Sequence, residues 1–335
     1  MKTTPSNSIL ASLALPLALA SACGAPPPPP SPPPPAPPTA TEPSAQPSAT
    51  PEAAPPAPVA EPTPTTPSSR WTGGFATPES VVYDPAGDRY LVSNINGRPV
   101  DVDNNGFISE LSPDGTIKNL KWIEAGKGGA KLDAPKGMAI SGDLLYVADL
   151  DKVRTFSLKT GAPKGEIKLE GATFANGVVA GPDGKVYVSD SGLKMKGSEF
   201  EPSGTDAVWV ISKKKATVIA KSTELGKPNG LAIDEKGLLV CTFGSGEVYR
   251  LGADGARSDV QKPPKGGLDG LVFFGGDVLV SSWEGSAVYR KTPGGDFAPI
   301  VVGAKAPADF AVDTKRKLVI VPRFLDDAVE AYPIP

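Results

Sequence analysis

A short polar step recurs at the start of six similar segments, and it constrains the fold more than any other feature of the sequence. Successive polar residues lie 57, 40, 53, 40 and 40 residues apart. Such a period indicates a repeat architecture, in which each unit stacks on its neighbours because it cannot bury its apolar faces alone. The polar residues, in chain order, are Glu79, Lys136, Asn176, Asn229, Asp269 and Asp309.

The fourth segment shows how each unit is built. Its polar step is followed by three strand-like runs, Leu231–Ile233, Leu238–Thr242 and Glu247–Leu251, with Gly- and Asp-containing turns between them. A further turn at 253–255 leads into a weaker outer strand. Four short strands per unit at this spacing are typical of a propeller blade. The sequence therefore predicts an all-β, six-bladed β-propeller with four-stranded blades.

Two further expectations concern the closure of the ring and its mouth. The sixth unit ends after its third strand, Ala328–Tyr332, so the stretch Arg70–Phe75 is expected to supply the missing strand. The longer spacings place insertions between second and third strands, at Asn94–Phe107 and Ser191–Thr205. Such loops return to the face where first strands begin, so both insertions are expected to overhang the mouth where the polar residues gather.

The N-terminal part differs from the rest in composition. Lys2 and the short apolar run Ile9–Ala20 indicate a secretory signal, since a helix needs about 20 residues to span a bilayer. Residues 24–69 are almost wholly Pro, Ala, Ser, Thr and Glu, too poor in apolar bulk to form a core. We divide the chain into a lipoprotein signal peptide (1–22), a lipidated cysteine with a disordered Pro-rich tether (23–69) and the propeller (70–335).

The small residues before Cys23 resemble the bacterial lipoprotein lipobox, although Ala20 stands where that motif usually has Leu. The resemblance implies that Cys23 is lipidated and anchors a secreted protein in the cell envelope. Gly24 favours the outer membrane if the organism is diderm. An ordinary cleaved signal with a chance cysteine is the alternative. Cys241, in an apolar strand, is interpreted as a small buried hydrophobe.

The composition narrows the possible chemistry. The chain contains no histidine, which removes Ser-His-Asp hydrolysis, histidine acid–base catalysis and zinc sites that need imidazole. Its net charge is −3, and no basic stripe indicates nucleic acid. We expect a monomer that acts on a small molecule, with the membrane as its other partner.

Four of the polar-step residues offer oxygen ligands at a common centre, because corresponding positions of innermost strands face the axial channel. Two carboxylates and two amide oxygens suit a hard divalent cation such as Ca²⁺, which could supply Lewis-acid chemistry. The alternative is that Asn-Gly and Asp-Gly are turns that tolerate left-handed conformations. Glu79 and Lys136, which occupy the same position, argue against it. The four residues are Glu79, Asn176, Asn229 and Asp269.

Over residues 71–335, Glu in the first unit, Asn in the third and fourth and Asp in the fifth resemble the superfamily of gluconolactonase and senescence marker protein. The phrase Pro182–Asp190 resembles that superfamily and the related NHL repeats. The resemblance implies that these four residues hold a catalytic metal, usually calcium, and that Asp269 doubles as general base or nucleophile. It thus implies a metal-dependent hydrolase that opens a lactone or related ester.

Two positions depart from that pattern. Lys136 places an ammonium in the ring, where it could assist catalysis by binding an anionic substrate or oxyanion, or pair with Glu79 and replace the metal. Asp309 adds a carboxylate that would offset it. The alternative function is therefore a non-catalytic, NHL-like propeller that binds a small ligand, glycan or protein partner.

Polar residues at the ends of second strands, with Trp283 beside them, are candidates for contacts with a lactone or sugar-like substrate. The alternative is polar strand ends that meet solvent. The stretch Asp101–Gly106 resembles the opening of an EF-hand calcium loop, but Ser112 stands at the closing position, so a calcium site and a polar turn both remain open. The strand-end candidates are Asn94, Asp149, Asp190, Thr242, Ser282 and Arg323, with Trp283 and Arg323 ranked first.

Overall fold

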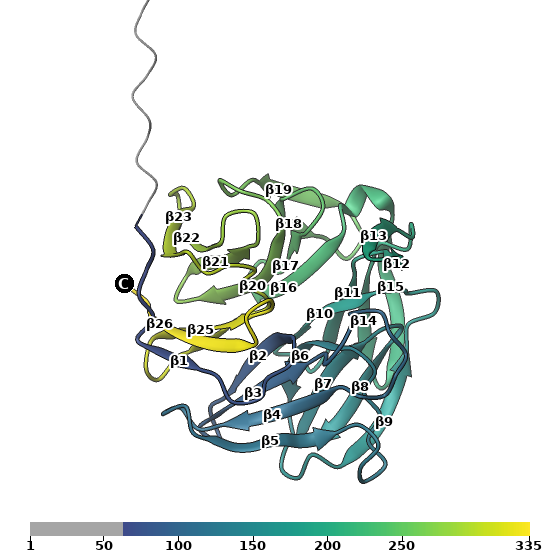
Figure 1. Ribbon diagram of the computed structural model, residues 1–335. Coiled ribbons are helices and arrows are strands. Elements are labelled where there is room, and N and C mark those ends of the chain that lie inside the picture. Colours follow the sequence, from purple (N-terminus) through teal and green to yellow (C-terminus); the bar gives the residue numbers. More distant parts are fainter. Residues whose placement is uncertain (1–62) are drawn as a thin grey trace, which may run out of the picture. The chain divides into compact units, whose positions relative to one another are not determined.

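The computed structural model describes residues 63–335, which form six four-stranded antiparallel sheets set as blades around a central axis (Figure 1). The predicted all-β, six-bladed propeller is confirmed. The predicted signal peptide, Cys23 and most of the predicted tether lie outside the described residues. Within the described range, no helix is long and apolar enough to cross a membrane.

Each blade begins with its innermost strand and proceeds outward. Blade one comprises β2 (Pro78–Asp84), β3 (Arg89–Asn94), β4 (Phe107–Leu111) and β5 (Ile117–Glu124). Blade two comprises β6 (Pro135–Ser141), β7 (Leu144–Asp149), β8 (Lys152–Ser157) and β9 (Pro163–Lys168). Blade three comprises β10 (Ala175–Ala180), β11 (Val186–Asp190), β14 (Ala207–Ser212) and β15 (Lys215–Lys221), with the separate hairpin β12 (Leu193–Lys196) and β13 (Glu199–Pro202).

The second half of the ring repeats this plan. A single 3-10 turn, η1 (Thr223–Leu225), precedes blade four. Blade four comprises β16 (Pro228–Asp234), β17 (Gly237–Thr242), β18 (Val248–Leu251) and β19 (Arg257–Gln261). Blade five comprises β20 (Leu268–Phe274), β21 (Asp277–Ser282), β22 (Ala287–Lys291) and β23 (Ala298–Val302). Blade six comprises β24 (Ala311–Asp313), β25 (Leu318–Arg323), β26 (Ala328–Pro333) and β1 (Ser69–Trp71).

The ring is closed by β1, which pairs with β26 as the outermost strand of blade six. The register places Arg70 opposite Glu330 and Trp71 opposite Val329. The prediction that the N-terminal stretch supplies the missing strand is confirmed, with the strand starting at Ser69 and ending at Trp71. Phe75, also in the predicted stretch, is buried in the core between blades six and one instead.

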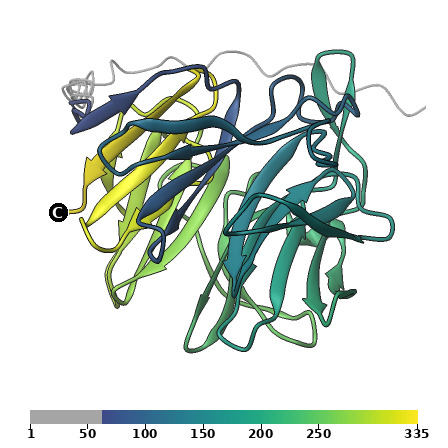
Figure 2. The same cartoon turned by 90° about the horizontal axis from the view of Figure 1, so that it is seen from below.

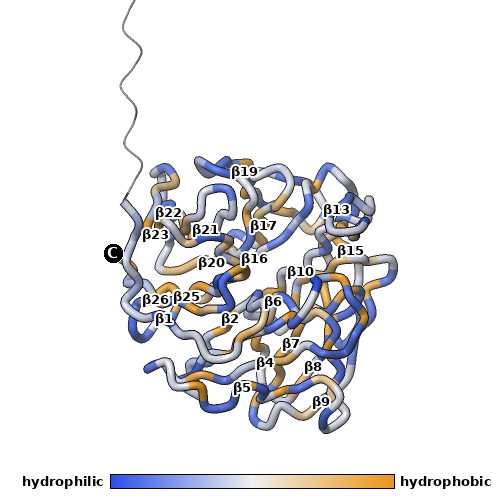
Figure 3. Tube along the Cα trace, viewed as in Figure 1, coloured by the Kyte–Doolittle hydropathy of each residue, from blue (hydrophilic) through white to orange (hydrophobic). Residues whose placement is uncertain are grey.

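The core is divided among the six interfaces between neighbouring blades, each with its own cluster of buried apolar side chains. Val81 and Val92 of blade one, for example, pack with Ile320 and Val329 of blade six. Apolar positions lie along the strands and hydrophilic ones gather in the peripheral turns (Figure 3). The sequence predicted this arrangement, because a single blade cannot bury its own apolar faces and must pack against its neighbours.

Both insertions lie at one face of the ring, as predicted. Ile95 and Pro99 of the first insertion line the same cavity as Leu193 and Phe200 of the second. The side view shows the β12–β13 hairpin projecting from that face (Figure 2). We call this face, which carries the loops between second and third strands, the mouth.

Candidate functional site

The polar step coincides with an irregularity in strand pairing. Between the first and second strands of blades one to five, the register shifts at the polar step. In blade four, for example, Pro228 pairs with Thr242 and regular pairing resumes only at Leu231. A bulge of this kind leaves a residue outside the ladder and redirects its side chain. The sequence period thus marks the place where each inner strand turns one polar side chain toward the axis.

The glycine after most of these residues serves close packing between blades. A Cβ atom on Gly177 would lie 2.3 Å from the carbonyl oxygen of Asn229, and one on Gly230 would lie 2.3 Å from that of Asp269. Asn176, Asn229 and Asp269 keep negative φ angles and lie within strands. The alternative of left-handed turns is therefore wrong, and glycine is needed because the next inner strand passes too close for a side chain.

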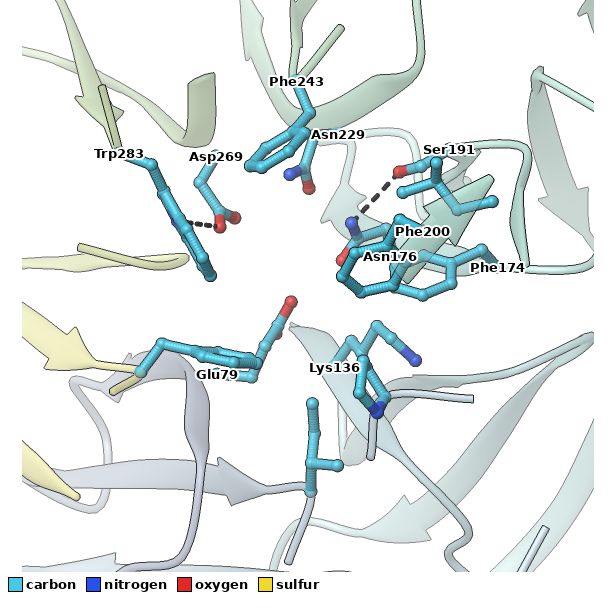
Figure 4. A pocket seen from close by; sticks show the side chains of 14 residues that line it. Glu79, Lys136, Phe174, Asn176, Ser191, Phe200, Asn229, Phe243, Asp269 and Trp283 are labelled. Atoms are coloured by element: carbon cyan, nitrogen blue, oxygen red, sulfur yellow. Dashed lines mark hydrogen bonds between the residues drawn. The ribbon is translucent and has the colours of Figure 1, made fainter. Parts of the chain in front are cut away.

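Four of the six polar-step side chains meet at one cavity in the mouth. They come from blades one, three, four and five, as the sequence predicted, and surround an open space (Figure 4). All four are buried, with exposed fractions of 6% or less. They are Glu79, Asn176, Asn229 and Asp269.

Hydrogen bonding fixes which atoms of this ring face the cavity. Asn176 Nδ2 donates to Ser191 Oγ at 3.1 Å, and Asn229 Nδ2 donates to the Leu268 carbonyl at 3.4 Å. Both amide oxygens are thereby left toward the open space (Figure 4). Asp269 Oδ2 accepts a hydrogen bond from Trp283 Nε1 at 2.7 Å. Asn176, Asn229 and Asp269 thus each use one side-chain atom for a protein hydrogen bond and keep the other oxygen free of one.

Two buried carboxylate oxygens remain without a partner. Among the described residues, nothing hydrogen-bonds Glu79 Oε2 or Asp269 Oδ1. An unpaired buried carboxylate oxygen is costly, so it requires a ligand, a proton or an ion. The described residues hold no group of three His, Cys, Asp or Glu side chains able to bind a metal, and the ring reaches four ligands only with its two amide oxygens. A mixed carboxylate and amide oxygen set fits a hard cation such as Ca²⁺.

Burial is the main cause of the shifted pKa values of the two acidic side chains of the ring. Burial, followed by the charge of Asp309, raises the pKa of Asp269 to about 8. Burial, followed by the charge of Asp269, raises the pKa of Glu79 well above its usual range. Burial therefore favours the protonated forms of these two carboxyl groups. A divalent cation would stabilise their ionised forms.

Lys136 lines the cavity but does not pair with Glu79. Its Nζ donates to the Ala134 carbonyl at 3.0 Å and lies 4.4 Å from the centre of the Phe174 ring. No ion pair within 4.0 Å joins it to Glu79 in the described part of the chain. Burial lowers the pKa of Lys136 to about 8, which the charge of Glu79 partly opposes. The alternative in which this ammonium replaces the metal is not seen.

Asp309 is turned away from the cavity. Its inner strand, β24, begins only at Ala311, and an isolated bridge between Pro307 and Arg323 lies one residue out of register with the pairing of β24 and β25. Asp309 Oδ2 accepts a 2.6 Å hydrogen bond from Ser80 Oγ and faces a second axial cavity of about 450 Å³. Burial raises the pKa of Asp309 to about 7. It acts on the ring through its charge and does not offset Lys136 directly.

Cys241 supports the backbone of the ring. In blade three, Ser189 Oγ accepts from the Gly177 N–H and donates to the Asn229 carbonyl at 2.6 Å. Cys241 holds the corresponding position in blade four, where its thiol donates to the Asp269 carbonyl at 3.1 Å. The residue is fully buried, as the sequence suggested, but it also holds the strand that carries Asp269.

The residues that wall the cavity lie one position beyond the predicted substrate contacts. The second strands of blades four, five and six end at Thr242, Ser282 and Arg323. The next residue in each case lines the cavity, because neighbouring side chains of a strand point to opposite sides. Trp283 was predicted for its proximity and is confirmed as a wall residue. The wall residues that follow second strands are Ile95, Ser191, Phe243, Trp283 and Phe324.

The strand-end candidates themselves are buried supports, so their prediction as substrate contacts is corrected. Asn94 Oδ1 accepts from the Ala76 N–H at 3.1 Å, and Asp190 accepts from the backbone of Phe174 at 2.9 Å. The alternative of strand ends meeting solvent is also wrong, since all are at most 6% exposed.

Asp149 and Arg323, the two remaining charged candidates, are also bound to other parts of the protein. Asp149 accepts from the Ala134 N–H at 2.8 Å and from the guanidinium of Arg154 at 2.5 Å. Arg323 binds the carboxylate of Glu330 at 2.5 Å. These bonds tie the strand ends to Ala134 in a loop and to the third strands β8 and β26.

The stretch Asp101–Gly106 forms a polar turn. Both carboxylate oxygens of Asp101 accept hydrogen bonds from the Arg98 guanidinium, at 2.9 and 2.7 Å. Asp103 Oδ2 accepts from Asn105 Nδ2 at 2.7 Å. Asp101 is thus paired with Arg98, Asp103 is bonded to Asn105, and Asn105 Oδ1 is buried without a hydrogen-bond partner among the described residues.

Fold and site together define a six-bladed propeller with an oxygen-lined axial cavity. A gluconolactonase from Xanthomonas campestris shares the fold, with a TM-score of 0.60 and 17% identity over 79% of this chain and 88% of its own. A protein provisionally named a gluconolactonase gives 0.57 at 22% identity, over 79% and 93%. A catalytically inactive histidine-to-alanine variant of Staphylococcus aureus virginiamycin B lyase, solved with quinupristin, gives 0.54 at 16%, over 80% and 99%. No protein-family model and no curated protein matches the chain.

Proposed function

We propose that this protein is a metal-dependent hydrolase of the gluconolactonase type, which opens a lactone or related ester. The observation that carries the proposal is the pair of unpartnered carboxylate oxygens, on Glu79 and Asp269, facing the same cavity as two amide oxygens. The similarity to virginiamycin B lyase gives less support for a shared activity. The lyase variant described as inactive has lost a histidine, and this chain contains no histidine.

The proposed role of each residue follows from the side-chain atoms that have no hydrogen-bond partner within the protein. Glu79, Asn176, Asn229 and Asp269 would hold a divalent cation, most simply Ca²⁺, which when bound supplies a Lewis acid for the carbonyl and the attacking water. Asp269 is held by Trp283, so that Oδ1 can take a proton from that water. Lys136 adds positive charge beside the cavity, where negative charge develops on the carbonyl oxygen.

The proposed reaction balances with water as the only co-reactant. The oxygen of water bonds to the carbonyl carbon, and the bond from that carbon to the ring oxygen breaks. One proton of the water passes through Asp269 to the leaving oxygen. The other leaves with the acid product, a hydroxycarboxylic acid that ionises at neutral pH.

Calcium titration by calorimetry tests the proposed site, and we expect binding that tightens between pH 6 and pH 8.5. The pKa of Asp269 is raised to about 8 by burial and by Asp309, so binding at pH 6 must displace a proton. Titrations in two buffers of different ionisation enthalpy should reveal this release. Absence of binding at millimolar calcium would contradict the proposal.

The same shift predicts how the stability of the calcium-free protein depends on pH. A carboxyl group whose pKa is higher in the folded than in the unfolded chain stabilises the fold at low pH. That contribution is lost as pH rises from about 4, the unfolded value, to about 8, the folded value of Asp269. Urea denaturation should therefore show the benefit of added calcium growing over this window.

We also propose that the protein is anchored in the cell envelope through a lipid on Cys23, as the lipobox-like sequence suggests. Replacing Cys23→Ser is expected to move the protein from the detergent to the aqueous phase in a Triton X-114 partition and to abolish labelling with fatty acid. Cys241→Ser is the matched control, because Cys241 is buried within the propeller. Unchanged partition of the Cys23 variant would contradict the anchor.

A further inference from the structure

The wall above the oxygen ring is apolar on two opposite sides (Figure 4). On one side, Trp283 lies between Phe243 and Phe324, with ring centroids 5.6 and 5.1 Å away. On the other side, Phe174 and Phe200 meet edge to face at 5.8 Å. The five aromatic side chains come from four blades, so the wall is built jointly by most of the blades around the mouth.

The polar atoms of the wall above the oxygen ring already have hydrogen-bond partners or an aromatic neighbour. Ser191 Oγ accepts from Asn176 and donates to the Pro228 carbonyl at 2.8 Å. Trp283 Nε1 is used by Asp269, and the Lys136 amine rests on a backbone carbonyl and an aromatic ring. A polyhydroxylated ligand would have to give up its hydrogen bonds to water at this wall without replacing them.

The apolar surface continues outward from the cavity to solvent. Phe200, which lines the cavity, is 48% exposed in the hairpin β12–β13 of blade three. This hairpin lies between the second and third strands of the blade, at the mouth. An apolar substituent of a substrate would be removed from water where it lies against Phe200.

We infer that the site takes lactones or esters that carry an apolar chain or ring, in preference to polyhydroxylated sugar lactones. The inference rests on the proposed function, since it names the substrate class of the same site. The cavity measures about 60 Å³, far below the roughly 300–1,000 Å³ of pockets that bury a whole ligand. The reacting carbonyl therefore enters the ring, while the substituent lies against the aromatic side chains above it. The proposal narrows the lactone or sugar-like substrate expected from the sequence to an apolar lactone or ester.

The inference is tested with the full chain and two six-membered lactones, δ-decanolactone and glucono-δ-lactone. We expect kcat/KM to be at least tenfold higher for the alkyl lactone. Phe200→Ala should lower that value about tenfold and change it less than twofold for δ-valerolactone, which has no substituent. Val218→Ala, an exposed apolar residue of the outer strand β15, is the control and should change neither. Faster hydrolysis of glucono-δ-lactone would overturn the inference and leave the proposed function intact.

A binding measurement separates the two claims if no lactone is hydrolysed. Calorimetry with calcium present should show the lactam analogue of δ-decanolactone binding at least tenfold more tightly than gluconolactam, and Phe200→Ala should remove most of the difference. This result without any hydrolysis supports the inference and contradicts the proposed hydrolase. Equal affinities, absence of binding by the alkyl lactam, or no effect of Phe200→Ala would overturn the inference.

Discussion

Asp269→Asn is expected to lower kcat/KM for lactone hydrolysis by about 10²- to 10⁴-fold, the usual contribution of a positioned general base. Asparagine keeps an oxygen for Trp283 Nε1 and can keep another polar atom at the cavity, so the local structure should survive. What it removes is the ability to accept a proton from water. The measurement is steady-state hydrolysis at saturating calcium, with calorimetry to confirm that the metal still binds.

Asp309→Asn is the matched control, since it removes a buried carboxylate from the same axis without touching the cavity. Asparagine can still accept the hydrogen bond from Ser80 Oγ. Activity within about fivefold of wild type is expected, and the apparent pKa of Asp269 should fall because the charge of Asp309 raises it. If Asp269→Asn retained full activity, Asp269 would not be the base.

The fold was predictable because its determinants are local and repeated. Every segment shows the features of a propeller blade: a period of about 40 residues, short strands and Gly/Asp turns. The sixth segment has too few strands for a blade, so it required a strand from elsewhere in the chain. The structure confirms this closure through β1, although Phe75 leaves the strand to enter the core.

The oxygen ring was predictable for the same reason, since its register repeats with the blades. The wall residues of the cavity were not predicted. The polar residues at the ends of second strands were chosen as candidates, whereas the residues that follow them line the cavity. An apolar residue directly after a polar strand end, as at Thr242-Phe243 and Arg323-Phe324, was the available signal. The direction of Lys136 depends on Phe174 of the next blade and on a backbone carbonyl, neither of which sequence spacing specifies.

The interface between blades six and one, which we call the seam, also positions one residue of the candidate site. Glu79 lies on β2, next to this seam, and its carbonyl accepts from the Asp309 N–H at 2.9 Å. Trp71 of β1 stacks on Tyr90 of β3 across the same seam, with centroids 5.8 Å apart. Closure of the ring and placement of Glu79 are thus parts of one interface.

Trp71→Ala is therefore expected to destabilise the protein by about 3 kcal/mol, the lower end for loss of a packed tryptophan, because Trp71 is only partly buried. Urea denaturation measures this, with Val260→Ala as control, since a residue 49% exposed on β19 should cost less than about 0.5 kcal/mol. Because Trp71 packs on Tyr90 of β3, which pairs with the strand that carries Glu79, calcium affinity should fall with stability. Equal stability of the two variants would show that blade six holds the seam without Trp71, and that Glu79 is positioned by its inner-strand contacts alone.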